Sequence, residues 1–276
     1  MTDMPRHLVE RALRRDRWIV GFGLIVLFLL AWAYLLGGAG TGMSLAQMTS
    51  ASLFPHSDRI GSAVALERWG VAYAAGMVGM WWVMMVAMMT PSVAPIILLQ
   101  AQAARHAEAK GAENAPALRQ TGTFAAGYLL IWLVFSGAAT FLQWALEAGG
   151  LLSTMAMGSQ SVWLSASLLF AAGVYQFSPI KNFCLRHCQA PAAFLSRHWR
   201  PGTGGALRMG TIHGAYCVGC CWALMMLLFV GGVMNPIWIL ALATIVLLEK
   251  IAAQGALIGK AGGVLLLLWG GATLLV

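Results

Sequence analysis

The sequence predicts an all-α membrane protein, a polytopic helical bundle with about seven transmembrane helices. Hydrophobic residues make up 60% of the 276 residues and charged residues only 9%, and the mean hydropathy is +0.77. This composition is typical of a membrane protein and not of a soluble one. The apolar residues fall into long stretches, and all but two of the 17 Lys and Arg (Arg59 and Arg68) lie on one side of the resulting topology, as the positive-inside rule expects.

Residues 1–17 form a basic leader, and residues 18–276 form a single helical membrane domain. Its predicted spans lie near residues 18–36, 70–99, 122–146, 161–177, 210–232, 237–253 and 256–276. The first span is longer than the apolar region of a signal peptide, which favours an uncleaved anchor. The sixth contains only a short apolar stretch, 237–248, before Glu249, so six crossings are possible if this segment is re-entrant. As a full crossing it needs Lys250 to snorkel to the inner interface.

The segment 41–69 reads as an outside loop with an interfacial helix, in which His56 and Asp58 are expected to be solvated. Glu249 is the only carboxylate embedded between predicted spans. Acidic residues inside a membrane often mark functional sites. A pair with Lys250 at the helix end is the alternative interpretation.

The stretch 213–222 holds three of the five cysteines and one of the six histidines. On a helix, four side chains share an arc roughly 100° wide at the start of the predicted fifth span: His213, Cys217, Cys220 and Cys221. Soft and borderline metals prefer thiolate and imidazole ligands, although cysteine also packs inside helices as a small apolar residue. Because the helix rises roughly 12 Å from the first of these residues to the last, no single ion can contact all four.

A second segment is therefore needed, and the basic loop 178–209 supplies it with Cys184 and Cys188. Their i, i+4 spacing makes them face the same way on a helix. The topology places this loop at the membrane face where the fifth span starts. A three- or four-ligand metal site is expected from these residues: Cys184, Cys188 and Cys217 with His213 or Cys220.

Two cations, Lys181 and Arg186, flank the loop cysteines and are expected to lower the pKa of their thiols. The odd number of cysteines argues against a complete disulfide framework. Their predicted position on or near the cytoplasmic side keeps the thiols reduced.

The second span carries a stripe of methionines, four of which share an arc of about 80°: Met77, Met80, Met84 and Met88. Thioethers suit Cu(I), so Met84 and Met88 are candidate copper contacts. Adaptable packing between helices is the alternative. Pro91 and Pro95 must kink this helix. A membrane tolerates a broken helix only beside protein or a wet cavity, which indicates a site nearby.

Three segments resemble a known family: Trp82–Pro95 (WVMMVAMMTPSVAP), Tyr175–Pro191 with its CLRHC, and His213–Lys250, which begins HGAYCVGCC and ends LLEK. Over roughly residues 70–275 the chain is similar to the bacterial family of predicted metal-binding integral membrane proteins, a domain of unknown function. The resemblance implies a multi-pass inner-membrane protein with a metal site. It supplies neither a reaction nor the choice of metal.

Together these features predict an integral membrane protein that handles a soft transition metal through a Cys/His cluster at the cytoplasmic face. It would act as a carrier or as a supply factor for a recipient membrane metalloenzyme, with copper as Cu(I) favoured and zinc second. Two alternatives stay open. One is a membrane enzyme, either metal-dependent or exchanging thiol electrons with quinone. The other is a structural zinc site that joins the basic loop to the fifth span.

An enzyme is the less favoured alternative, because a thiol protein that oxidises secreted partners needs cysteines on the outer side, where none is predicted. The sequence also has no Ser-His-Asp set, Walker loop or HExxH motif. The expected location is the bacterial inner membrane with the N-terminus in the cytoplasm. The expected partners are the lipid bilayer and a metal ion. The net charge of +8 does not indicate nucleic acid, because the cations follow the sidedness of the membrane.

Overall fold

The computed structural model describes residues 6–39, 48–49, 69–111, 115–153 and 157–275. Within these ranges the chain is helical, with one isolated β-bridge between Leu152 and Ser159. Most of the predicted loop 41–69, with His56 and Asp58, lies outside the described residues.

In chain order the helices are α1 (Arg6–Leu36), α4 (Val71–Ala109), α5 (Ala117–Ala148), α6 (Val162–Tyr175), α7 (Pro179–Gln189), α8 (Pro191–His198), α9 (Gly202–Met226), α10 (Leu228–Gly231), α11 (Pro236–Ile251) and α12 (Gly255–Thr273). In the part of the chain that the structure describes, five helical stretches are long and apolar enough to cross a membrane. These belong to α1, α4, α5, α9 with α10, and α12. With 14 and 16 residues, α6 and α11 are roughly 21 and 24 Å long, shorter than the hydrocarbon core. The count of seven crossings therefore stays a prediction.

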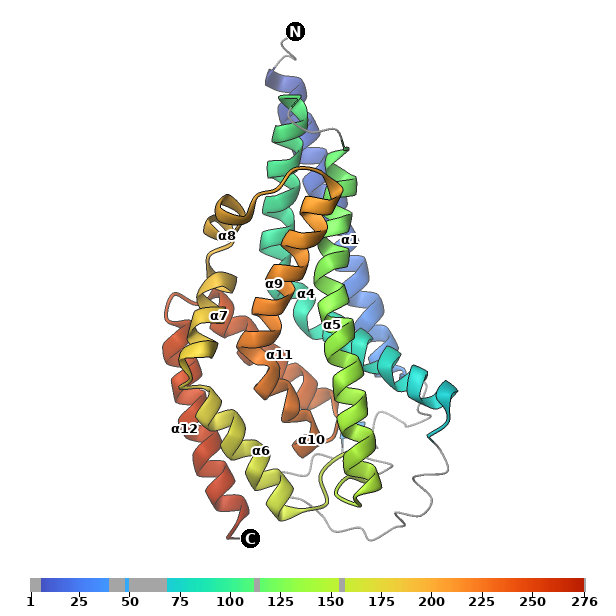
Figure 1. Cartoon of the computed structure of the whole chain (residues 1–276), viewed down its shortest axis with the longest axis vertical. Helices are drawn as coiled ribbons and strands as arrows, with labels where there is room; N and C mark the ends of the chain where they lie inside the picture. The colour runs from blue at the N-terminus through green and yellow to red at the C-terminus, as the bar shows by residue number, and fades with distance from the viewer. Residues whose placement is uncertain (1–5, 40–47, 50–68, 112–114, 154–156, 276) are drawn as a thin grey trace.

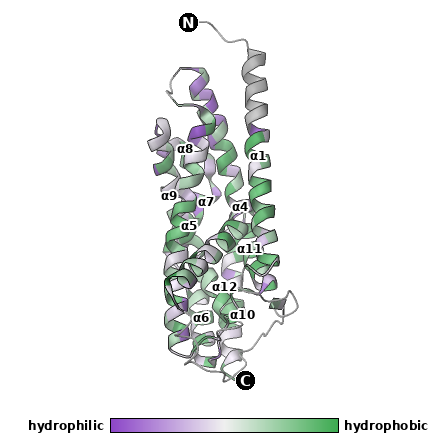
Figure 2. Ribbon diagram, turned by 90° about the vertical axis from the view of Figure 1, so that its right-hand side faces the viewer, coloured by the Kyte–Doolittle hydropathy of each residue, from purple (hydrophilic) through white to green (hydrophobic). Residues whose placement is uncertain are grey.

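The outer surface of the bundle is apolar in the way that lipid requires. Large hydrophobic side chains are exposed on several helices, among them Phe22, Phe141, Trp163 and Leu265. Figure 2 shows hydrophobic residues along the body of the molecule and the strongest hydrophilic colour towards the end where the N-terminus lies. A soluble protein rarely leaves so much apolar surface open to water.

At the centre of the bundle, α5 packs against both α4 and α9, α1 lies on α4, and α6 pairs with α12 (Figure 1). Glycine allows the close approach of α5 and α9. A Cβ atom on Gly210 would meet the carbonyl of Phe124, and one on Gly127 would meet the backbone of Leu207. Membrane helices commonly use such small residues, because close backbone contact supplies the packing energy there.

The long helix α4 bends between its first and second halves (Figure 1). Pro91 and Pro95 lie inside it and remove two backbone donors, as the sequence predicted. Neighbouring hydroxyls bond to backbone carbonyls of the same stretch: Thr90 Oγ1 donates to Val86 O at 2.6 Å and Ser92 Oγ to Met89 O at 2.9 Å. The second half of α4 also contacts α11 here, through Ser92.

A buried ion pair fixes α7 to α11. Lys181 Nζ lies 2.7 Å from Glu249 Oε2, and the two side chains are 2% and 1% exposed. Gln176 bonds to both charged groups, and Gln189 Nε2 donates to the carbonyl of Glu249 at 2.7 Å. Glu249 therefore pairs with α7 instead of with its neighbour Lys250.

We expect Glu249→Gln to lower the free energy of unfolding by about 3–5 kcal/mol, because it leaves the Lys181 ammonium buried without its counter-charge. The double variant Lys181→Met/Glu249→Gln should recover most of this loss, since no charge is then left buried. Chemical or thermal unfolding in detergent, followed by circular dichroism, measures both effects.

The partly exposed pair of Arg105 and Glu108 on α4, at 2.9 Å, provides the matched control. Arg105→Gln should cost less than about 1 kcal/mol, as is usual for pairs in contact with solvent. A double variant no more stable than Glu249→Gln alone would contradict this account of the buried pair.

Candidate metal centre

Helix α9 turns its cysteines into the bundle. Cys217, Cys220 and Cys221 are each 1% exposed. The helix begins at Gly202, earlier than the predicted start of the span at residue 210, because it includes glycine-containing residues expected in the loop. Cys217 therefore lies roughly 22 Å along α9, near the middle of the apolar stretch Gly202–Gly231, instead of at the start of a span.

Helix α7 lies beside α9 and adds a further cysteine. The Cys188 side chain interacts with those of Cys217 and Cys220, and Cys221 interacts with the same two. We call these four residues the thiol cluster: Cys188, Cys217, Cys220 and Cys221. The structure thus brings together the two cysteine segments that the sequence analysis paired, and all the cysteines are free thiols.

Cys184 lies next to the thiol cluster, at the contact between α7 and α9. A Cβ atom placed on Gly219 would be only 2.7 Å from Cys184 Sγ, so glycine is needed here for α7 to approach. The Tyr175 hydroxyl donates to the Gly219 carbonyl at 2.5 Å. Gly219 is thus a contact point for α6 and α7 on α9.

The flanking cations do not act as expected on Cys184. Burial raises the pKa of the Cys184 thiol, and the nearby Cys220 raises it further. Lys181 is held by Glu249, and Arg186 is exposed. The predicted lowering of the Cys184 pKa by Lys181 and Arg186 is therefore wrong.

Cys217 is the centre of the polar contacts. Its Sγ lies 3.0 Å from the Tyr128 hydroxyl on α5 and 3.0 Å from Lys250 Nζ on α11. Lys250 Nζ also donates to Ser92 Oγ at 3.1 Å and lies 3.8 Å from Met89 Sδ. The sequence predicted that Lys250 would snorkel to the interface, but it is 7% exposed and points into the bundle, because α4 and α9 offer it polar and sulfur partners there.

His213 lies about one turn before Cys217 on α9 and is 3% exposed. Aromatic rings surround it, with Phe194 closest at 5.0 Å between centroids and Tyr128 at 6.0 Å. Its buried Nδ1 has no hydrogen-bond partner among the described residues. An unsatisfied buried nitrogen is costly, which makes His213 a candidate ligand.

The thiol cluster is not arranged around an ion as it stands. No group of three or more His, Cys, Asp and Glu side chains within the described ranges is placed to hold a metal. Cys220 Sγ and Cys221 Sγ both donate to the Cys217 carbonyl at 3.0 Å, so these sulfurs are turned towards their own helix. To bind an ion, the side chains of Cys220 and Cys221 would have to rotate and break these hydrogen bonds to the backbone.

The methionine stripe of α4 lies wholly inside the bundle: Met77, Met80, Met84, Met85, Met88 and Met89 are all buried. At one end, Met77 Sδ lies 4.0 Å from Gln143 Nε2. At the other end, Met89 Sδ approaches Lys250 Nζ. Met89 is thus the methionine that contacts Lys250, the residue whose ammonium lies beside Cys217. Met84 and Met88 lie in the core between Met77 and Met89.

A second cluster of buried polar side chains lies at the Met77 end of the methionine stripe. Gln143 Nε2 donates to Glu147 Oε1 at 2.9 Å, and Trp81 Nε1 donates to Gln143 Oε1 at 2.8 Å. Trp69 Nε1 bonds to the other oxygen of Glu147 at 2.9 Å. Glu147 lies just beyond the predicted third span, 122–146, whereas the structure includes it in α5. The i, i+4 spacing of Gln143 and Glu147 on an apolar helix was the signal for this group.

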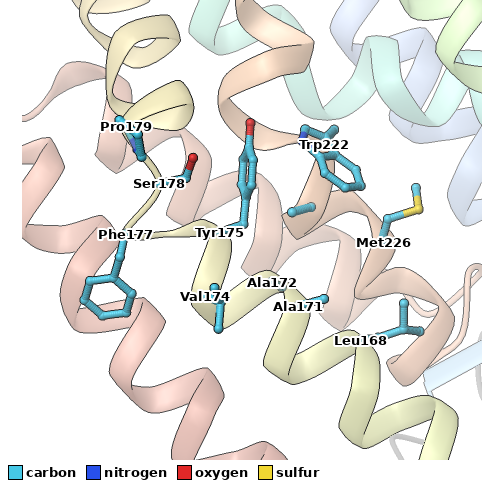
Figure 3. A pocket seen from close by; sticks show the side chains of 11 residues that line it. Leu168, Ala171, Ala172, Val174, Tyr175, Phe177, Ser178, Pro179, Trp222 and Met226 are labelled. Atoms are coloured by element: carbon cyan, nitrogen blue, oxygen red, sulfur yellow. The ribbon is translucent and has the colours of Figure 1, made fainter.

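An apolar groove of about 590 Å³ lies on the α6 side of the cysteines. Figure 3 shows Tyr175 and Trp222 next to each other, with Phe177 and Pro179 to the left and Leu168 and Met226 to the right. The Tyr175 and Trp222 rings meet edge to face at 5.2 Å. None of the described residues that line the groove is charged, so the groove does not extend the polar surroundings of Cys217.

Comparison with known proteins finds no match among curated proteins and none among solved structures. A family model described as PpoB2, copper chaperone, matches residues 78–273. The matched region begins in α4, ends in α12 and contains every cysteine of the chain. The chain therefore belongs to the PpoB2 copper chaperone family.

Proposed function

We propose that this protein is an integral membrane copper chaperone that binds Cu(I) at the thiol cluster and passes it to a recipient membrane metalloenzyme. The observation that carries the proposal is the position of Cys217. Its sulfur lies deep in the bundle, where side chains from α5, α7, α9 and α11 converge on it. Family membership supports copper as the cargo.

Cys217 and Cys188 are the proposed first ligands, because they come from different helices and their side chains already interact. Two thiolates satisfy the low coordination number and soft character of Cu(I). Cys220 and Cys221 join after their sulfurs leave the Cys217 carbonyl. His213 and Cys184, at the edges of the cluster, complete the proposed set.

Met84 and Met88 are the proposed path away from the thiol cluster. They lie in the buried stripe that runs from Lys250 to the polar group of Gln143 and Glu147. Thioethers hold Cu(I) weakly enough for it to move on, and they need no deprotonation. In this proposal the stripe conducts copper towards the end of α4 that carries Met77.

The proposed location is the bacterial inner membrane, with the N-terminus in the cytoplasm and seven crossings. The five long apolar helices support a membrane location. The clustering of Lys and Arg in alternate connecting segments supports the orientation.

Cys217→Ser should lower the affinity for Cu(I) at least about tenfold, since loss of a ligand should cost 1.4 kcal/mol or more. Anaerobic competition with a chromogenic Cu(I) chelator measures the affinity of the detergent-purified chain. Met85→Leu, a buried change of similar volume outside the proposed set, is the control and should bind as the wild type does. Equal affinities in the wild type and Cys217→Ser would refute the site.

The double variant Met84→Leu/Met88→Leu should fold and keep Cu(I) at the thiol cluster, because leucine resembles methionine in volume and apolarity. It should release copper into vesicles, or transfer it to an acceptor, at least about tenfold more slowly than the wild type. If copper moves at the wild-type rate, these methionines serve packing alone.

A further inference from the structure

We infer that Lys250 determines the metal specificity of the thiol cluster: its positive charge favours a monovalent ion over a divalent one. This inference rests on the proposed Cu(I) site and adds how that site rejects zinc. Lys250 Nζ lies 3.0 Å from Cys217 Sγ. A metal ion bound to that sulfur therefore has an ammonium group as its neighbour.

The ammonium is held in this position from α4. Ser92 Oγ accepts a hydrogen bond from Lys250 Nζ at 3.1 Å, and Met89 Sδ lies 3.8 Å from the same nitrogen. Because Lys250 is 7% exposed, water does not screen its charge well. The side chain therefore acts as a fixed cation next to the metal position.

No carboxylate cancels this charge within the described residues. Glu249, the adjacent residue, is committed to Lys181 at 2.7 Å, and Lys250 takes part in no salt bridge in the described part of the chain. Glu147, the other buried carboxylate on the α4–α5 side, bonds to Gln143 and Trp69. The counter-charge for Lys250 must therefore come from the cysteines.

Charges buried in an apolar bundle must nearly cancel. With Cys188 and Cys217 as the two thiolates and every further ligand bound in its neutral form, bound Cu(I) carries a net charge of about −1, which the Lys250 ammonium balances. A divalent ion on the same two thiolates is already neutral, so the ammonium leaves an excess positive charge in the bundle. The same ammonium thus stabilises the Cu(I) complex and opposes the divalent one.

Ligand geometry acts in the same direction. Zinc prefers four ligands in a tetrahedron, and an ammonium at 3.0 Å from Cys217 Sγ takes up space beside that sulfur. Cu(I) is satisfied by fewer ligands, so the crowding costs it less.

The test compares the affinities of the full chain for Cu(I) and for Zn(II), each measured by competition with a chromogenic chelator. Lys250→Met is expected to reduce the preference for Cu(I) over Zn(II) at least about tenfold. Lys250→Arg, which keeps the charge, should retain the preference. Lys260→Met, which removes an exposed lysine from α12, is the matched control and should leave both affinities unchanged.

Lys250→Gln provides a second neutral variant if Lys250→Met does not yield folded protein by size exclusion and circular dichroism. A preference within about threefold of the wild type in the folded neutral variant would overturn the inference. A separate result tests the proposed function: it is refuted if Cu(I) binds equally well to the wild type and to Cys217→Ser. Cu(I) binding that depends on Cys217, with an unchanged preference in Lys250→Met, would overturn the specificity role alone.

Discussion

The arrangement of the site depends on one constraint: a charge buried among apolar helices needs a partner within contact distance. Near its C-terminal end, α11 carries two opposite charges in succession, Glu249 and Lys250, and both are buried. Successive residues on a helix point about 100° apart, so the two side chains reach different neighbours. Glu249 pairs with Lys181 on α7, and Lys250 contacts Cys217 on α9. One turn of α11 thereby holds both helices that supply the cysteines.

The small residues of α9 allow this convergence. Gly210 lies against the backbone of α5, and Gly219 leaves room for Cys184 of α7. Larger side chains at these positions would separate the helices and move the thiols apart. Close backbone approach is the usual source of helix association in a membrane, where burial of apolar surface gives little advantage. Glycine therefore serves both packing and the position of the cluster.

The sequence predicted the helical class, the approximate helices and the pairing of the two cysteine segments, because hydrophobic runs and i, i+4 spacing are local properties. It did not predict the direction of Lys250, since apolar length alone suggested snorkelling and the partners on α4 and α9 are distant in sequence. Tyr128 and Ser92 were missed for the same reason. The depth of Cys217 was also misjudged, because residues 202–209 were assigned to the basic loop, whereas α9 already begins at Gly202.

The hydrogen bonds within the thiol cluster favour a metal ion that is bound and released over a permanent structural metal. Structural zinc sites are closed, with four ligands set around the ion. Here the sulfurs of Cys220 and Cys221 bond to the backbone of their own helix instead. Binding an ion must break these contacts, and releasing the ion restores them, so the protein itself competes for the ligands. Such competition lowers affinity without moving any helix, which suits a protein that must give its copper away.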